Sequence, residues 1–209
     1  MKQLFLAGIL ICISISTFAQ DNKDSSKEDN TFNQMLDYSR PGKYHQLLEE
    51  LVGNWKFEGS RLEWIDSVTS KEVMKLAGSL TRKSFADGRF FIAEITTAAK
   101  IQLPVKDGKM ITDYAKAIQL EGYDNVKKKF QLSYINNHIG SDITFWQGTY
   151  DSTTRTISFY SSIADIPGQE INIRFDFVFN DKNHYQWNYY SEQNGKYIKD
   201  TEMNFRRVQ

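Results

Sequence analysis

The chain has 209 residues, with 26 basic and 26 acidic side chains, three histidines and a single cysteine. The formal net charge of zero excludes the strongly basic surface that a phosphate backbone requires, so we expect no nucleic-acid partner. A lone cysteine excludes an internal disulfide framework, and a chain of this length is long enough to bury one core of its own.

The first 19 residues have the pattern of a secretory signal peptide. Lys2 supplies a positive start, an apolar run covers 4–18, and small residues at Thr17 and Ala19 fit the positions that signal peptidase reads. The run is shorter than the roughly 20 residues that span a bilayer. We therefore expect cleavage between Ala19 and Gln20, which makes the protein periplasmic or secreted and leaves no transmembrane segment.

Cys12 raises one alternative, a lipid-modified N-terminus. The lipoprotein pattern needs a small residue just before the cysteine, where this chain has Ile11. We therefore expect Cys12 to be removed with the signal peptide. The exported chain then has no thiol for disulfides, metal binding or nucleophilic chemistry, and its fold must be held by its core.

Polar and charged residues dominate 20–40, and this composition predicts a disordered spacer before a single domain over 41–209. Pro41-Gly42 then opens a short amphipathic helix that ends at Gly53. We expect this helix to cap one end of a sheet. Its apolar positions, at helical spacing, are Tyr44, Leu47, Leu48, Leu51 and Val52.

From Trp55 onward the apolar residues recur with a period of two, which is typical of half-buried strands. The clearest alternation covers 171–179, where five apolar residues share one face. Turn signals such as Pro167-Gly168 and Asn194-Gly195 separate the runs and predict hairpins. The ten expected strands are 54–65, 72–85, 89–98, 115–123, 128–136, 142–150, 155–162, 169–179, 184–191 and 196–207.

These short connections leave no room for crossover helices, so the sheet is expected to be antiparallel. A sheet of about ten strands tends to close or fold over, because an open edge invites aggregation. We therefore predict an all-β, up-and-down barrel, with a two-sheet sandwich as the alternative. Residues 99–114, interrupted by Pro104 and Gly108, are expected to be a loop that serves as a lid at the barrel mouth or is a simple insertion.

Five short motifs follow one another in a fixed order along the domain. They are His45-x-x-Leu48 with Val52-Gly53-Asn54-Trp55; Asp87-Gly88-Arg89-Phe90; Glu121-Gly122-Tyr123-Asp124-Asn125 with Lys129-Phe130; Gly148-Thr149-Tyr150-Asp151; and Glu202 with Arg206. Over about 41–207 the chain resembles the domain-of-unknown-function family 1579, a group of bacterial, often exported proteins. The resemblance implies a lipocalin-like or fatty-acid-binding-like barrel, and it implies no activity.

The chain departs from the family pattern in one strand. The tryptophan and aspartate that family members tend to carry after the Gly-Tyr-Asp-Asn turn are Tyr134 and Asn136 here. If the family uses that aspartate in an interior site, this member lacks its charge.

The sequence contains no Gly-x-Ser-x-Gly nucleophile elbow, no His-Glu-x-x-His zinc-binding helix, no glycine-rich phosphate-binding loop and no calcium-binding loop. We therefore expect no cofactor and no metal. The three histidines, His45, His138 and His184, fall in three different elements. His45 and Glu49 could form a ligand pair, but we favour a surface contact one helical turn apart. His184 could ligate haem, but we favour an ordinary histidine at a strand end.

Glu202 and Arg206 share one face of the last strand. Pointing inward, they could orient a ligand carboxylate, because arginine offers a planar fork to such groups. Met203 and Phe205 occupy the opposite face, so we favour an outward placement of the charged pair.

Aromatic residues on the apolar strand faces are the best indication of an internal cavity, which they either line or fill. We predict a protein that binds a small apolar or amphipathic ligand in the barrel, with its oligomeric state left open. The alternatives are an enzyme using the same cavity, which we disfavour, and a filled barrel acting as an envelope or interaction protein. The predicted lining residues are Trp55, Phe57, Arg89, Tyr123, Tyr134, Phe145, Gln147, Phe175, Phe177, Trp187 and Tyr189.

Overall fold

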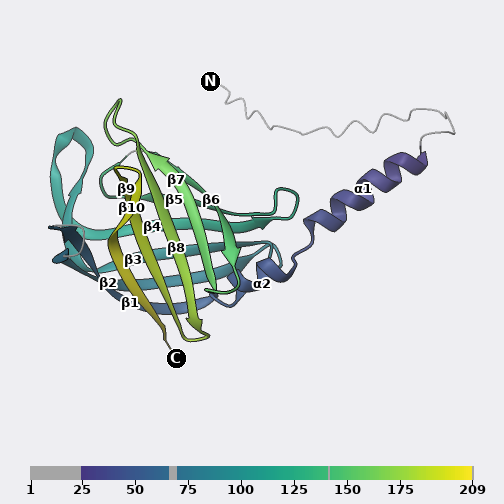
Figure 1. Cartoon of the computed structure of the whole chain (residues 1–209), viewed down its shortest axis with the longest axis horizontal. Helices are drawn as coiled ribbons and strands as arrows, with labels where there is room; N and C mark the ends of the chain where they lie inside the picture. Colours follow the sequence, from purple (N-terminus) through teal and green to yellow (C-terminus); the bar gives the residue numbers. More distant parts are fainter. Residues whose placement is uncertain (1–24, 66–69, 141, 209) are drawn as a thin grey trace, which may run out of the picture. The chain divides into compact units, whose positions relative to one another are not determined.

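Ten antiparallel strands form one closed barrel in a computed structural model that describes residues 25–65, 70–140 and 142–208. Each strand pairs with the next along the chain, and β1 also pairs with β10, so the predicted up-and-down barrel is confirmed over the sandwich (Figure 1). The strands are β1 (Gly53–Trp64), β2 (Ser70–Phe85), β3 (Phe90–Pro104), β4 (Met110–Asp124), β5 (Lys129–Asn136), β6 (Thr144–Asp151), β7 (Thr156–Ile163), β8 (Ile171–Asp181), β9 (His184–Gln193) and β10 (Lys196–Arg207).

Alternation along each strand sends every second side chain into the barrel. In β8, Phe175, Phe177 and Phe179 are at most 6% exposed. The closing register places Phe57 of β1 opposite Phe205 of β10, so both rings enter the same core. The apolar face that was visible in the sequence is therefore the barrel interior.

Helix α2 (Lys43–Glu49) closes one end of the barrel, as predicted, and is shorter than expected. Leu48 and the following Leu51 are 0% and 3% exposed within the core. Arg207 of β10 donates hydrogen bonds of 2.6 Å from its guanidinium to the carbonyl oxygens of Glu50 and Val52. These bonds satisfy carbonyl groups after the helix that would otherwise lack partners, and they join its end to the last strand.

The expected loop over 99–114 is wrong. Strand β3 continues to Pro104, a short 3-10 turn η1 covers Lys106–Gly108, and β4 begins at Met110. Pro104 is tolerated because it is the last residue of β3, where its missing N–H costs few of the hydrogen bonds between the strands. The segment is a long hairpin at the end of the barrel away from α2 (Figure 1).

The spacer expected to be disordered over 20–40 is helical from Ser25, where α1 (Ser25–Ser39) begins. Phe32, Met35 and Leu36 lie three and four residues apart, which gives this polar segment one apolar stripe. The chain divides between Asp37 and Tyr38 into two units, and the barrel belongs to the second. The expected signal peptide, 1–19, lies outside the described residues.

Candidate functional site

Aromatic side chains fill the middle of the barrel. The Trp187 ring lies 4.4 Å from Phe205 and 5.4 Å from Phe177, measured between ring centroids. Tyr185 stacks on Phe205 at 4.6 Å with an angle of 11° between the rings. Such close ring pairs leave little free volume, so this part of the interior is packed core.

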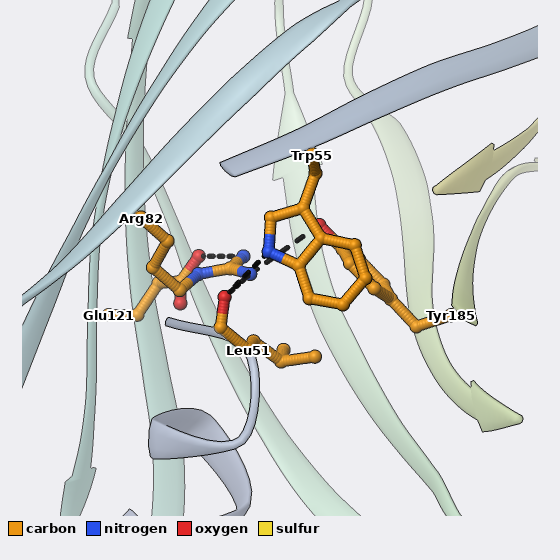
Figure 2. A network of polar contacts seen from close by, with 5 residues as sticks. All are labelled: Leu51, Trp55, Arg82, Glu121 and Tyr185. Atoms are coloured by element: carbon orange, nitrogen blue, oxygen red, sulfur yellow. Dashed lines mark hydrogen bonds and ion pairs between the residues drawn. The ribbon is translucent and has the colours of Figure 1, made fainter. Parts of the chain in front are cut away.

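A buried ion pair lies between this core and α2 (Figure 2). Arg82 of β2 donates from Nη2 to Oε1 of Glu121 on β4 at 2.8 Å, and neither side chain is exposed. Arg82 Nη1 also lies 3.4 Å from the Tyr185 hydroxyl and 3.5 Å from the Leu51 carbonyl oxygen. Trp55 Nε1 donates to the same Leu51 carbonyl at 2.9 Å. The network therefore ties the segment that follows α2 to strands β1, β2, β4 and β9.

The electrostatics of this network keep Arg82 charged. Burial opposes its positive charge, but the neighbouring Glu121 carboxylate and Tyr185 outweigh burial and raise the pKa of Arg82 above its usual value. Burial raises the pKa of the Tyr185 hydroxyl, which therefore stays neutral. The pair is closed off from solvent, so we assign it a structural role at the plugged end of the barrel.

Sequence reasoning missed the Arg82–Glu121 pair. A signal was present, because Arg82 follows Leu80 at a spacing of two, and Glu121 precedes Tyr123 in the same way. Each charge therefore lies on the inward face of its strand. That the two would meet depends on β2 and β4 lying on either side of β3.

The end of the barrel opposite α2 is different, because its inward side chains are only partly buried. The register places Tyr134 of β5 and Tyr189 of β9 on the inward face, and burial raises the pKa of both phenols. We call this set of half-buried side chains the mouth. It consists of apolar and phenolic side chains. Its members are Leu76, Ile95, Tyr134, Ile163, Tyr189 and Met203.

Polar groups stand beside the mouth. Ser191 Oγ donates to Oδ2 of Asp200, which lies at the irregularity in the pairing of β9 with β10. Burial raises the pKa of Asp200, while the bonds from Ser191 and Thr201 and the charge of Arg61 oppose this shift. A partly buried carboxyl with a raised pKa therefore lies next to the apolar and phenolic side chains of the mouth.

Eight of the predicted lining residues face the interior. Tyr134 and Tyr189 belong to the mouth, and the other six are at most 9% exposed in the core. The structure thus places Tyr134 and Tyr189 at the mouth and the other six residues in the packed core. The six core residues are Trp55, Phe57, Tyr123, Phe175, Phe177 and Trp187.

Placement of the other three in the interior is wrong. Phe145 is 69% exposed and Gln147 is also exposed, because β6 turns Trp146 and Gly148 inward instead. The sequence misled us because Phe145 is apolar and alternates with Ile143, which resembles the buried face of a strand. Arg89 is exposed in the β2–β3 turn, where its Nε donates to the Ala86 carbonyl at 3.2 Å.

The charged pair on the last strand faces outward, as we favoured. Phe205 is 0% exposed whereas Arg206 is exposed, and Glu202 accepts a 2.7 Å bond from Lys199 Nζ. His45 corrects our expectation of a surface contact: it is 4% exposed, and its Nδ1 accepts a 3.0 Å bond from the Gly42 amide.

His184 is the first residue of β9, and its Nδ1 lies 3.2 Å from Nδ2 of Asn180. Over the part of the chain that the structure describes, no three histidine, cysteine, aspartate or glutamate side chains gather as a metal site. Among the helices of those residues, none is both long and apolar enough to cross a membrane.

Comparison with known proteins identifies a family. The family model described as "Protein of unknown function (DUF1579)" matches residues 40–207. No curated protein matches the chain. Among solved structures, the chain is similar to an S-type phycobiliprotein lyase, CPES, from Guillardia theta, with a TM-score of 0.45 and 11% identity. That likeness covers 82% of this chain and 96% of the lyase.

Proposed function

The chain belongs to the DUF1579 family of proteins of unknown function, and we propose that it binds a small apolar or amphipathic molecule at the mouth of its lipocalin-like barrel. The observation that carries the proposal is the difference between the two ends of the interior. One end is plugged by α2 and a fully buried ion pair, while the other presents half-buried apolar and phenolic side chains to solvent.

The chemistry of the mouth supports an amphipathic ligand. Ile95, Ile163 and Met203 offer apolar contact, and the phenols of Tyr134 and Tyr189 combine a ring with a hydroxyl. Small-molecule sites are typically apolar concave surfaces with a few polar groups that fix orientation. A ligand would cover apolar surface that water contacts at present, at about 25 cal/mol for each Å² buried.

Native mass spectrometry of the protein purified from its own host tests the proposal. We expect a reproducible added mass that is lost on denaturation, and we expect the identified molecule to raise the melting temperature of the emptied protein. A clean apo mass, together with no stabilisation across a panel of lipids and aromatic molecules, would contradict ligand binding.

A matched pair of variants locates the site. Ile163→Trp adds bulk within the mouth, whereas Tyr160→Trp adds it on the outer face of the same strand, where Tyr160 is 46% exposed. We expect Ile163→Trp to weaken binding about tenfold or more, the equivalent of about 1.4 kcal/mol, and Tyr160→Trp to leave the affinity unchanged. Equal effects of the two variants would place the ligand elsewhere.

An enzyme acting on the same kind of molecule is the second candidate, favoured by Asp200. Its raised pKa and its position beside the mouth are those of an acid–base group. If the bound molecule is a substrate, Asp200→Asn should abolish turnover and leave binding intact. If the unaltered protein binds the molecule without converting it, this would contradict an enzymatic role and support ligand binding only.

We also propose that the protein is exported after removal of residues 1–19. The proposal is supported by the short apolar run over 4–18 and the small residues before Gln20. N-terminal sequencing of protein recovered from the periplasm or medium should begin at Gln20. Recovery from the cytoplasm with an intact N-terminus would rule out this route.

A further inference from the structure

We propose that two copies of this chain associate through the outer surface of strands β2–β6. This surface carries apolar side chains at outward positions, where a solvated barrel normally has polar ones. We call it the outer apolar face and define it by six residues. They are Phe85, Phe90, Ile118, Leu120, Ile135 and Phe145, with exposed fractions of 58%, 50%, 41%, 52%, 42% and 69%.

The strand register makes these residues neighbours. Phe85 pairs with Phe90 between β2 and β3, and Ile118 pairs with Ile135 between β4 and β5. Leu120 pairs with Ser133, which in turn pairs with Phe145 of β6. Ile92 lies two residues from Phe90 on the same face of β3 and pairs with Leu120, so the six side chains form one patch across five strands.

The area of the patch is that of an interface. With about 200 Å² for each complete side chain, the exposed fractions amount to about 600 Å² of apolar surface, at the upper limit for a typical monomer. Interfaces are only about 57% apolar, so this area corresponds to a footprint of about 1,000 Å² per copy. A stable complex of standard size needs about 800 Å² from each partner.

The shape of the face favours a second copy of the same chain. A groove of about 810 Å³ runs over it, lined in part by Phe90, Ile92 and Leu120. Phe145 lines the same groove and is the most exposed of the six side chains. A two-fold axis brings the same patch of both copies together, so Phe145 of each copy can enter the groove of the other.

Charge does not oppose this association. At the middle of the face, the strand partners of Leu120 are Ile92 and Ser133, which are uncharged. Glu94, which pairs with Ile118, and Lys83, which pairs with Ile92, carry opposite charges. Absence of charge at the centre, with aromatic groups, is typical of interface cores. The formal net charge of zero also means that two copies do not repel each other at long range.

Sedimentation velocity of the purified chain at increasing concentration tests the proposal. We expect a species of twice the chain mass. Leu120 lies at the middle of the face and Phe145 enters the groove of the other copy, so Leu120→Lys and Phe145→Asp should each raise the dissociation constant at least about 100-fold, as for side chains in desolvated pockets of an interface. The control is Ile166→Asp in the β7–β8 connection, where the side chain is 55% exposed and outside the face. It should leave the dimer unchanged.

Phe145 and Leu120 are more than half exposed, so their variants should fold, which circular dichroism and the melting temperature verify. In the unaltered protein, hydrogen exchange over 118–120 and 143–147 should slow as the dimer forms. A monomer at all concentrations, including one that binds lipid vesicles or a different protein through this face, would overturn the proposal. A dimer that survives both substitutions would overturn it as well.

Discussion

Arg82 and Glu121 lie 39 residues apart in the chain and form an ion pair of 2.8 Å in which neither side chain reaches solvent. Removing two charges from water is costly, and their attraction offsets the cost only while both are present. The pair also lies where the strands meet the end of α2, since Arg82 reaches toward the Leu51 carbonyl. Removing one residue of the pair should therefore lower the free energy of unfolding far more than removing both.

Arg82→Met leaves the Glu121 carboxylate buried without its partner, and we expect a loss of about 3–5 kcal/mol in the free energy of unfolding. The double variant Arg82→Met/Glu121→Leu removes both charges and should recover most of that loss. Urea unfolding of the two variants and the unaltered protein measures the difference. A double variant no more stable than the single one would mean that the pair has a role other than mutual neutralisation.

Gly78 of β2 should not tolerate alanine. A Cβ there would lie 2.5 Å from the Phe57 ring and would also meet the backbone oxygen of Thr96, which cannot move aside without breaking the sheet. We expect Gly78→Ala to cost at least about 3 kcal/mol in thermal or urea unfolding, the upper end of overpacking effects. Gly42→Ala is the control, because nothing lies within 4 Å of a Cβ at that position.

Stability should depend on the protonation of His45. Burial lowers the pKa of His45 in the folded protein, outweighing a backbone bond to Tyr123, whereas the unfolded chain titrates near pH 6.5. Above pH 6.5 both states are neutral and stability is complete. As the pH falls below 6.5 the unfolded state binds the proton first, so stability falls until the folded His45 also titrates.

Glutamine at position 45 can keep the bond from the Gly42 amide without titrating. The free energy of unfolding of His45→Gln, measured between pH 8 and pH 5, should therefore lack this decline. Asp200 is shared by both proteins, so its own titration cancels in the comparison. Parallel pH profiles for the two proteins would show that His45 does not contribute.

Asn125 should hold the segment that leads into α2. Its Nδ2 lies 2.8 Å from the carbonyl oxygens of both Tyr38 and Arg40. We expect Asn125→Ala to speed hydrogen exchange over 38–44 at least about fivefold, because each lost bond contributes about 1 kcal/mol. Global stability should change little, since this segment lies before the core residues of α2. Unchanged exchange over 38–44 would show that these bonds do not restrain it.

Much of the fold could be predicted from local sequence. The alternation over 171–179 predicted the strand observed as β8, and Asn194-Gly195 predicted the turn between β9 and β10. These features depend on neighbours in the chain, because a strand's apolar face and a turn's backbone conformation are set within a few residues. The long hairpin over 99–114 was missed, because Pro104 and Gly108 suggested a break where they end and turn a strand.

The site was predictable only in part. Tyr134 and Tyr189 were expected in the interior and do face it, but the sequence could not tell that they lie at the open end. Phe145 was assigned inward because it is apolar, although its neighbour Trp146 takes the interior position. Polarity alone cannot assign a strand face when both faces carry apolar groups.

The sequence by itself determined the all-β class, the approximate strand positions and the helix over the barrel end, because short-range periodicity and turn chemistry specify them. Only the tertiary structure decided that β1 closes on β10 to give a barrel over the alternative sandwich, that Arg82 meets Glu121, and that an apolar face remains on the outside. Each of these depends on contacts between residues far apart in the chain, which strand order, tilt and register bring together.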